Sequence, residues 1–171
     1  PVYDQIAKLR VRGIYGQRGE KRIYPGGGLA AHLLGYVNKE GVPATGAERH
    51  LNLYLKGEDG WIESEKDGAR RELAQFRSRE GPVQDGNTVV LTIDSVVQNI
   101  IEEELRRVAT AFSPRFATII VSDPKTGSIL GLANYPSYDP NEFNKAPLDA
   151  QRNCAVTDIV EPGSTFKIVA A

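Results

Sequence analysis

The sequence predicts an α+β fold, because β-prone runs bounded by turn residues occur beside segments of helical periodicity. The strongest helical signal covers residues 94–112, where apolar side chains return every three or four positions. The clearest strand signal is a pair of β-prone runs on either side of Asp67-Gly68, a dipeptide typical of tight hairpin turns. One chain therefore carries signals for both helices and antiparallel strands.

The chain changes character over residues 77–87, which are polar and contain Gly81, Pro82 and Gly86. Such stretches are typical of the exposed linkers between domains. We therefore expect a first module over residues 1–80, a linker over 81–87, and part of a second domain over 88–171.

The first module is expected to mix short strands with two helices. Leu29, Leu33 and Val37 repeat at helical spacing, and Gly57 stands where a second helix would stop. In chain order, we expect strands over residues 11–15 and 22–24 around a turn at Gly16 and Gly19, helices over 29–37 and 46–55, and hairpin strands over 61–65 and 69–76.

The second domain is expected to contain a long helix, for which Asp94 or Ser95 can supply the N-cap. Apolar side chains form one stripe along it, at positions 97, 101, 105, 108 and 112. A β-prone run precedes the helix over residues 88–93. Two further strands are expected over 116–121 and 128–133, joined by a turn with Pro and Gly where turns favour them.

Charge and composition exclude several function classes. The formal net charge is −1, whereas nucleic-acid-binding proteins usually carry a basic excess, so no nucleic-acid partner is expected. Cys154 is the only cysteine and cannot form an internal disulfide. With two histidines far from it in the sequence, a metal site built from these side chains is not expected either.

The apolar stretches of the chain fall short of the roughly 18–20 residues that span a membrane. The chain begins at Pro1, contains no methionine and shows no signal-peptide pattern. We therefore expect the sequence to be a fragment, whose lack of an anchor says nothing about the longer protein.

Ser164 and Lys167 are the candidate catalytic residues. Pro162-Gly163 predicts a turn, and a helix beginning near Ser164 would place both side chains on one face. Side chains tilt toward the helix N-terminus, so Lys167 is expected to lean over Ser164. A serine hydroxyl needs a nearby base to become a nucleophile. A lysine can serve only when desolvation or neighbouring cations lower its pKa.

A simpler interpretation of the pair stays open at this point. Ser-x-x-Lys is a short motif that arises by chance in many proteins. A serine at a helix start is a common cap, and a nearby lysine is commonly solvated. The surrounding residues, rather than the pair itself, favour a catalytic role.

Those surrounding residues resemble class B penicillin-binding proteins, along nearly the whole chain and in order. The division-specific (septal) branch fits best, although the elongation branch shares most motifs. Cys154 departs from the pattern, which usually has arginine there. The resemblance rests on Gly46-Ala47-Glu48, Leu55-Lys56-Gly57, Gly60, Asp67-Gly68, Leu91-Thr92-Ile93-Asp94 with Gln98, Asp123-Pro124-Lys125-Thr126-Gly127-Ser128-Ile129-Leu130, Pro136-Ser137-Tyr138-Asp139-Pro140-Asn141, Arg152-Asn153-Cys154-Ala155-Val156-Thr157-Asp158, and Glu161-Pro162-Gly163-Ser164-Thr165-Phe166-Lys167.

The resemblance implies a serine-type D,D-transpeptidase that cross-links peptidoglycan. Ser164 would attack the D-alanyl-D-alanine carbonyl of a stem peptide and form an acyl-enzyme, which the amino group of a second stem peptide then resolves. β-Lactams would acylate the same serine. Lys167 would be the general base, a role disputed in related β-lactamases, and the Ser164 backbone N–H would be one oxyanion donor. No cofactor or metal is implied.

The resemblance also implies an architecture and a location. Residues 1–80 would be most of a pedestal (dimerisation-type) module, and residues 88–171 the opening of a transpeptidase domain with a central antiparallel sheet and helices on its faces. The family's Ser-x-Asn and Lys-Thr-Gly motifs would follow beyond these residues, so this chain alone is expected to be inactive. The protein would sit at the outer face of the bacterial cytoplasmic membrane, held by an N-terminal helix missing from this chain.

Two other functions stay open. The segment could act as a non-catalytic pedestal module that docks cell-division or cell-wall membrane proteins. A β-lactamase or carboxypeptidase would share Ser-x-x-Lys, but the pedestal-like half argues against both.

Three further sequence patterns can be explained without assigning them a role in function. Lys125-Thr126-Gly127 spells a family motif but precedes Ser164, out of family order, and lies in an expected turn. Gly26-Gly27-Gly28 lacks the lysine and spacing of a phosphate loop. His32 and His50 have no convincing catalytic partner, so surface or packing roles are expected for them.

Overall fold

A computed structural model describes residues 2–8, 13, 19, 21–66, 68 and 72–170. The strand expected over residues 11–15 lies, Gly13 apart, outside the described residues, as does Gly16 of its turn. Asp67, the first residue of the expected hairpin turn, also lies outside them. The described chain begins with a short helix, α1 (Val2–Lys8).

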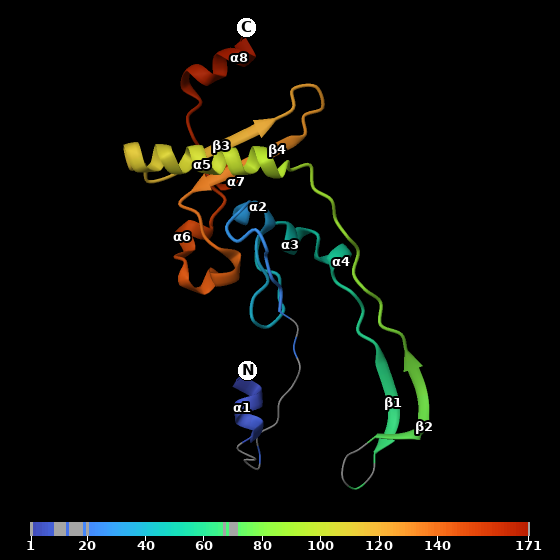
Figure 1. Ribbon diagram of the computed structural model, residues 1–171. Coiled ribbons are helices and arrows are strands. Elements are labelled where there is room, and N and C mark those ends of the chain that lie inside the picture. Colours follow the sequence, from blue (N-terminus) through green and yellow to red (C-terminus); the bar gives the residue numbers. More distant parts are fainter. Residues whose placement is uncertain are drawn as a thin grey trace.

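One long helix and a two-stranded sheet form the packed layer of the second domain (Figure 1). Helix α5 (Ser95–Phe112) lies across the antiparallel pair β3 (Ala117–Ser122) and β4 (Ile129–Tyr135). Ile101 and Leu105 are buried against Ala133. The predicted helix and both strands are therefore confirmed, with their ends shifted by one or two residues.

Local signals account for where α5 begins and how closely it approaches the sheet. The Asp94 carboxylate caps the helix by accepting hydrogen bonds from the backbone N–H groups of Val96 (2.8 Å) and Val97 (3.0 Å). On β4, a Cβ at Gly131 would lie 2.8 Å from Ile101 Cδ1. A larger residue at that position would force the Ile101 side chain to move.

The β-prone run over residues 88–93 does not form a strand, because it pairs with no described strand. It touches β4 only at its end, where Thr92 Oγ1 donates to Ile129 O (2.6 Å) and Asp94 N donates to Leu130 O (2.9 Å). The chain then turns into α5. A β-prone run forms a strand only where a partner continues the ladder.

The strand predicted over residues 22–24 is wrong. The backbone groups of Tyr24 are used by a side chain instead of a neighbouring strand: Tyr24 N donates to Asn141 Oδ1 and Asn141 Nδ2 donates to Tyr24 O, each over 2.9 Å. This pairing joins the two modules across more than a hundred residues of sequence.

The helices of the first module are shorter than the periodicity predicts. Helix α2 covers only Ala31–Leu34 and ends at Gly35, whose φ is 75°. The segment 46–55 divides into α3 (Gly46–His50) and α4 (Asn52–Leu55), because Leu51 leaves helical geometry with φ −102° and ψ 13°. Apolar spacing alone does not reveal such breaks.

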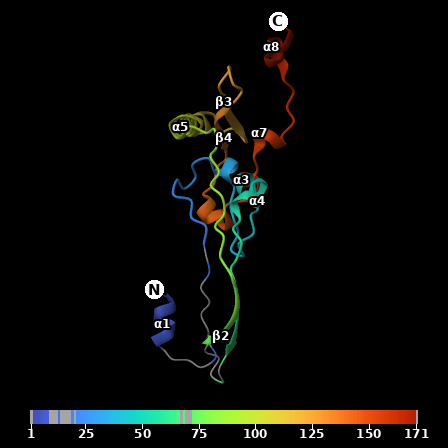
Figure 2. The same ribbon diagram turned by 90° about the vertical axis from the view of Figure 1, so that its right-hand side faces the viewer.

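The expected hairpin is present and reaches away from the α5 layer in both views (Figures 1 and 2). Strand β1 (Trp61–Lys66) pairs antiparallel with β2 (Glu72–Gly81). Arg77 and Arg79, assigned to the polar run at the boundary, instead lie in β2 opposite Ser64 and Glu63. Polar residues can form a strand when both faces are solvated. The domain limits at 80 and 88 stay a prediction.

Short helical segments follow β4 and end near the C-terminus: η1 (Pro140–Lys145), α6 (Leu148–Gln151), α7 (Cys154–Thr157), η2 (Gly163–Phe166) and α8 (Lys167–Ala170). In both views α8 stands at the end of the molecule opposite the β1–β2 hairpin. Within the described part of the chain, none of the helices combines the length and apolar character needed to cross a bilayer.

Candidate functional site

Ser164 and Lys167 lie on consecutive turns of one helical segment. Ser164 is the second residue of the 3-10 turn η2, and Lys167 is the first residue of α8. The helical conformation thus begins at Gly163, close to the predicted start at Ser164. Residues three apart in a 3-10 turn fall on the same side of it, so the backbone puts the hydroxyl and the amine on one side. Their catalytic roles stay a prediction.

The surroundings of this pair are open. Both side chains are exposed, and neither makes a hydrogen bond or ion pair with another described residue. Phe166 is 57% exposed and Val169 is 75% exposed. Large apolar side chains are rarely left so accessible in groups unless another surface covers them. Among the described residues, none encloses Ser164 and Lys167 in a dry pocket.

The segment is anchored from its N-terminal side by α7. Arg152 Nη2 lies 3.2 Å from Asp158 Oδ2, so an ion pair spans this short helix. The Arg152 guanidinium also stacks over the Phe116 ring at 5.0 Å. Cys154 is buried at the first position of α7. The unusual residue at position 154 thus serves packing in this structure.

Sequence reasoning missed a buried polar network on α5. The Gln98 side chain is fully buried and hydrogen-bonds to both backbone groups of Leu132, at 2.8 Å each. Gln98 Nε2 also donates to Glu102 Oε1 (2.8 Å), which in turn accepts from Ala30 N (2.7 Å). The network therefore ties the first module to the sheet. Its signal in the sequence is a glutamine beside the apolar stripe of an amphipathic helix.

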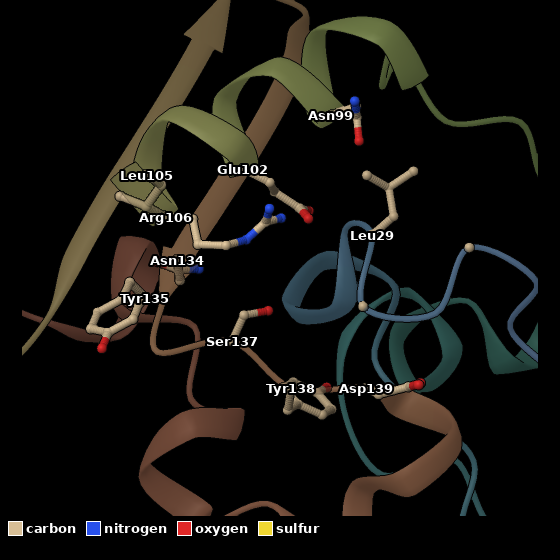
Figure 3. Close-up of a pocket in the computed structure, with 12 residues that line it drawn as sticks. Leu29, Asn99, Glu102, Leu105, Arg106, Asn134, Tyr135, Ser137, Tyr138 and Asp139 are labelled. Carbon is tan, nitrogen blue, oxygen red and sulfur yellow. The ribbon is translucent and has the colours of Figure 1, made fainter. Parts of the chain in front are cut away.

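A cavity of about 460 Å³ opens beside this network, between α5 and the turn that precedes α2. Figure 3 shows the Glu102 and Arg106 side chains extending into it from α5, with Leu29 and Ser137 on its other sides. The cavity lies between the two modules and does not include Ser164 or Lys167. It is a feature of the junction and not of the catalytic pair.

His32 also lies at this junction. It is 6% exposed, its Nε2 donates to Ala150 O (2.8 Å), and its ring meets Tyr138 edge-on at 5.3 Å. Burial lowers the pKa of His32, because a charged imidazole would lose its hydration there. His32 thus has the packing role expected for it, whereas His50 is exposed.

The Lys125-Thr126-Gly127 sequence is the turn between β3 and β4. Asp123 accepts from Lys125 N (2.9 Å) and from Thr126 Oγ1 (2.8 Å), and these hydrogen bonds hold down the pKa of its carboxyl group. Gly127 adopts a φ of 75°. The turn expected from the sequence is confirmed. Its geometry follows from Asp123 and Gly127, without any role for the lysine side chain.

Comparisons with known proteins match both halves of the chain. The family described as Penicillin-binding Protein dimerisation domain matches residues 3–91. The family described as Penicillin binding protein transpeptidase domain matches residues 117–171.

The chain is also similar to individual proteins along nearly its full length. It is 35% identical to the probable peptidoglycan D,D-transpeptidase PenA of Neisseria gonorrhoeae over 97% of this chain and 29% of that protein. It is 33% identical to the peptidoglycan D,D-transpeptidase FtsI of Escherichia coli K12 over 96% of this chain and 28% of that protein.

The fold is similar to that of solved structures. The crystal structure of penicillin binding protein 3 from Mycobacterium tuberculosis, complexed with ampicillin, superposes with a TM-score of 0.70 at 31% identity. That match covers 88% of this chain and 30% of the other. The chain thus spans less than a third of the length of each of these three proteins.

Proposed function

The chain belongs to the penicillin-binding proteins, and we propose that it carries the nucleophile of a serine-type peptidoglycan D,D-transpeptidase. The observation that supports this most directly is the placement of Ser164 and Lys167 three residues apart at the start of a helical segment. This segment lies inside the part of the chain that matches the transpeptidase domain. PenA and FtsI, which bear that activity in their names, match 97% and 96% of this chain.

The proposed chemistry begins with proton transfer. Lys167 Nζ, in its neutral form, takes the proton from Ser164 Oγ as this oxygen attacks the carbonyl carbon of the penultimate D-alanine. The Ser164 backbone N–H donates a hydrogen bond to the oxyanion that forms. The intermediate collapses when the C–N bond to the terminal D-alanine breaks and the leaving nitrogen takes up a proton.

A second transfer completes the reaction. The acyl group then sits on Ser164 Oγ as an ester, and the amino group of another stem peptide attacks the ester carbonyl. The new amide is the cross-link, and Ser164 regains its proton. A β-lactam enters the same first step, but its ring-opened acyl group remains attached to the nitrogen that would have left.

The substrate, partners and location follow from this assignment. The substrate would be a peptidoglycan stem peptide ending in D-Ala-D-Ala, and β-lactam antibiotics would be covalent inhibitors, as ampicillin is a ligand of the related Mycobacterium tuberculosis protein. The protein would act at the outer face of the bacterial cytoplasmic membrane, anchored by an N-terminal helix, in the division-specific branch to which the resemblance points. No cofactor is needed for the acyl transfer.

A second, compatible function is docking by the first module. The β1–β2 hairpin extends away from the α5 layer (Figure 2), and its Trp61 and Ile62 side chains are largely exposed. Exposed apolar side chains on a projecting element favour contact with another protein. A cell-division or cell-wall membrane protein would be the partner.

Labelling with a fluorescent penicillin tests the catalytic proposal in the full-length protein. Ser164→Ala should abolish covalent labelling, because it removes the hydroxyl oxygen that would hold the acyl group. Lys167→Arg should slow acylation by about 100-fold or more, since arginine keeps the charge but does not give up its proton at working pH. Wild-type acylation rates in Lys167→Arg would contradict the general-base role, and labelling of Ser164→Ala would contradict the function itself.

A further inference from the structure

Asn134 on β4 uses its whole side-chain amide to hold other parts of the chain. It is 4% exposed. Its Oδ1 accepts hydrogen bonds from Thr118 Oγ1 (2.7 Å) and from Ala155 N (3.2 Å), while its Nδ2 donates to Asn153 Oδ1 (2.8 Å). One of these bonds reaches across to β3, and the other two reach α7. A buried amide satisfied on both atoms fixes the position of its partners.

The strand register explains why Asn134 can reach α7. Ala133 packs beneath α5, and successive side chains on a strand point to opposite faces of the sheet. Asn134 therefore points to the face where α7 contacts β3 and β4. The two anchored residues, Asn153 and Ala155, are the N-cap and the second residue of α7.

Helix α7 depends on this anchor. It has four residues, and the Asn153 side chain does not cap it. A helix this short is not stable by itself, so tertiary contacts must hold it. At its other end, Thr157 Oγ1 donates to Asp158 Oδ1 (2.9 Å), and Arg152 pairs with Asp158. Residues 152–158 thus form one unit, which Asn134 holds on the sheet together with the buried Cys154 and the stacking of Arg152 on Phe116.

This unit lies shortly before the segment that carries Ser164. Five residues, 159–163, separate Asp158 from Ser164, and an extended chain of five residues spans at most about 17 Å. Ile159 and Val160 are strongly exposed and supply no anchor of their own. The unit that Asn134 helps to hold is the part of the chain before this stretch that packs on β3 and β4.

We propose that Asn134 is a positioning residue for acylation: through Asn153 and Ala155 it fixes α7 and thereby the start of the segment that carries Ser164. Asn134 does not contact the reacting atoms. The proposal rests on the proposed transpeptidase function. Asn134 lies on β4, thirty positions before Ser164, and its replacement should lower the acylation rate.

The test measures acylation of the full-length protein by fluorescent penicillin, as separate constants for non-covalent binding and for the covalent step. Asn153→Leu removes the acceptor for Asn134 Nδ2 and should slow the covalent step by about 10- to 100-fold, because a displacement near 1 Å can cost a factor of that size. Asn134→Ala should slow it at least as much. Asn153→Asp keeps an acceptor oxygen at the same place and should restore most of the rate.

Thr118→Val is the matched control. It removes a hydrogen bond from the same Asn134 oxygen, but on the side of β3 rather than α7. We expect it to lower the melting temperature while leaving the covalent step within about threefold of wild type, since it spares the Asn153 and Ala155 anchors. A purely structural role for Asn134 predicts the opposite, with rates that follow melting temperature in all variants.

Two results would overturn the inference. One is a wild-type covalent step in a folded Asn153→Leu protein, and the other is a loss in Thr118→Val equal to that in Asn153→Leu. The Ser164→Ala variant distinguishes an error in the positioning role of Asn134 from an error in the proposed transpeptidase function. If Ser164→Ala abolishes labelling while the Asn153→Leu protein is acylated at the normal rate, the proposed function is supported and the positioning role of Asn134 is wrong. If the Ser164→Ala protein is still labelled, the proposed function is wrong, and the positioning role of Asn134 is wrong with it.

Discussion

The Gln98 side chain on α5 pairs with both backbone groups of Leu132 on β4, donating to its carbonyl and accepting from its N–H at 2.8 Å each. These are the groups that a further strand would use at the edge of β4 not paired with β3. A side-chain amide has the same donor and acceptor pattern as a peptide group, so it can stand in for that strand. Gln98 thereby closes this edge and fixes the register of α5 on the sheet.

Replacing Gln98 should therefore destabilise the fold more than a typical surface change. Gln98→Leu leaves the buried Leu132 N–H and C=O without partners, and each unsatisfied group costs about 1–3 kcal/mol. We expect the free energy of unfolding to fall by about 3 kcal/mol in urea denaturation. The exposed neighbour Asn99 is the control, and Asn99→Ala should change stability by no more than about 0.5 kcal/mol. Equal effects of the two substitutions would contradict this account of the edge.

Burial of His32 should make stability depend on pH. Burial lowers its pKa in the folded protein below the usual value of 6.5, so the unfolded chain binds the proton more tightly. The stabilisation is fully present above pH 6.5 and is lost as the pH falls from there toward the folded-state pKa.

Thermal unfolding of wild type and His32→Gln across this range checks the sign. Glutamine can still donate to Ala150 O but does not titrate, so the wild-type melting temperature should drop more steeply on acidification. His50→Gln, at an exposed position, should keep the wild-type profile. A His32→Gln profile as steep as the wild-type one would rule out His32 as the titrating group.

The turn between β3 and β4 should depend on its glycine and not on its lysine. Gly127→Ala places a side chain at φ 75° and should cost about 1–2 kcal/mol of stability. Lys125→Ala should stay within about 0.5 kcal/mol and leave penicillin acylation unchanged. Melting curves and acylation rates of the two variants are the measurement. A hundredfold loss of acylation in a folded Lys125→Ala protein would show that Lys125-Thr126-Gly127 has a catalytic role after all.

Much of the packed layer could be predicted from local sequence. Asp94 caps the start of α5, and the predicted stripe supplies its buried face at positions 97, 101 and 105, whereas Val108 and Phe112 are exposed. The Pro and Gly of the turn after β3 separate the two strands. These signals are short-range, because caps, turns and periodicity are set by residues a few positions apart. The Ser164 segment was recognisable for the same reason, as its motif is contiguous.

The errors concern groups whose partners lie far away in the sequence. Residues 88–93 are β-prone, but no strand lies where their ladder would continue. The backbone of Tyr24 pairs with Asn141 rather than with a strand. The side-chain amide of Asn134 bonds to Thr118, Asn153 and Ala155, all of them distant in sequence. Local propensity does not encode these partners, so tertiary contacts override it.

The chain of 171 residues by itself should not react rapidly with penicillin. Ser164 and Lys167 are exposed, and no described residue shields them from water. General-base catalysis by lysine needs a desolvated site, which this segment does not build alone. Incubation with fluorescent penicillin, followed by gel analysis, should label the full-length protein and leave the 171-residue chain unlabelled. Stoichiometric labelling of the short chain within minutes would contradict this prediction.

Ser164 should be the residue that becomes acylated, and locating the adduct shows directly whether it is. The full-length protein is treated with a β-lactam, digested, and analysed by mass spectrometry for the peptide that gains the mass of the opened ring. We expect a single modified peptide, containing residues 163–167, with the added mass on the Ser164 hydroxyl. An adduct on a different side chain, with Ser164 unmodified, would contradict it.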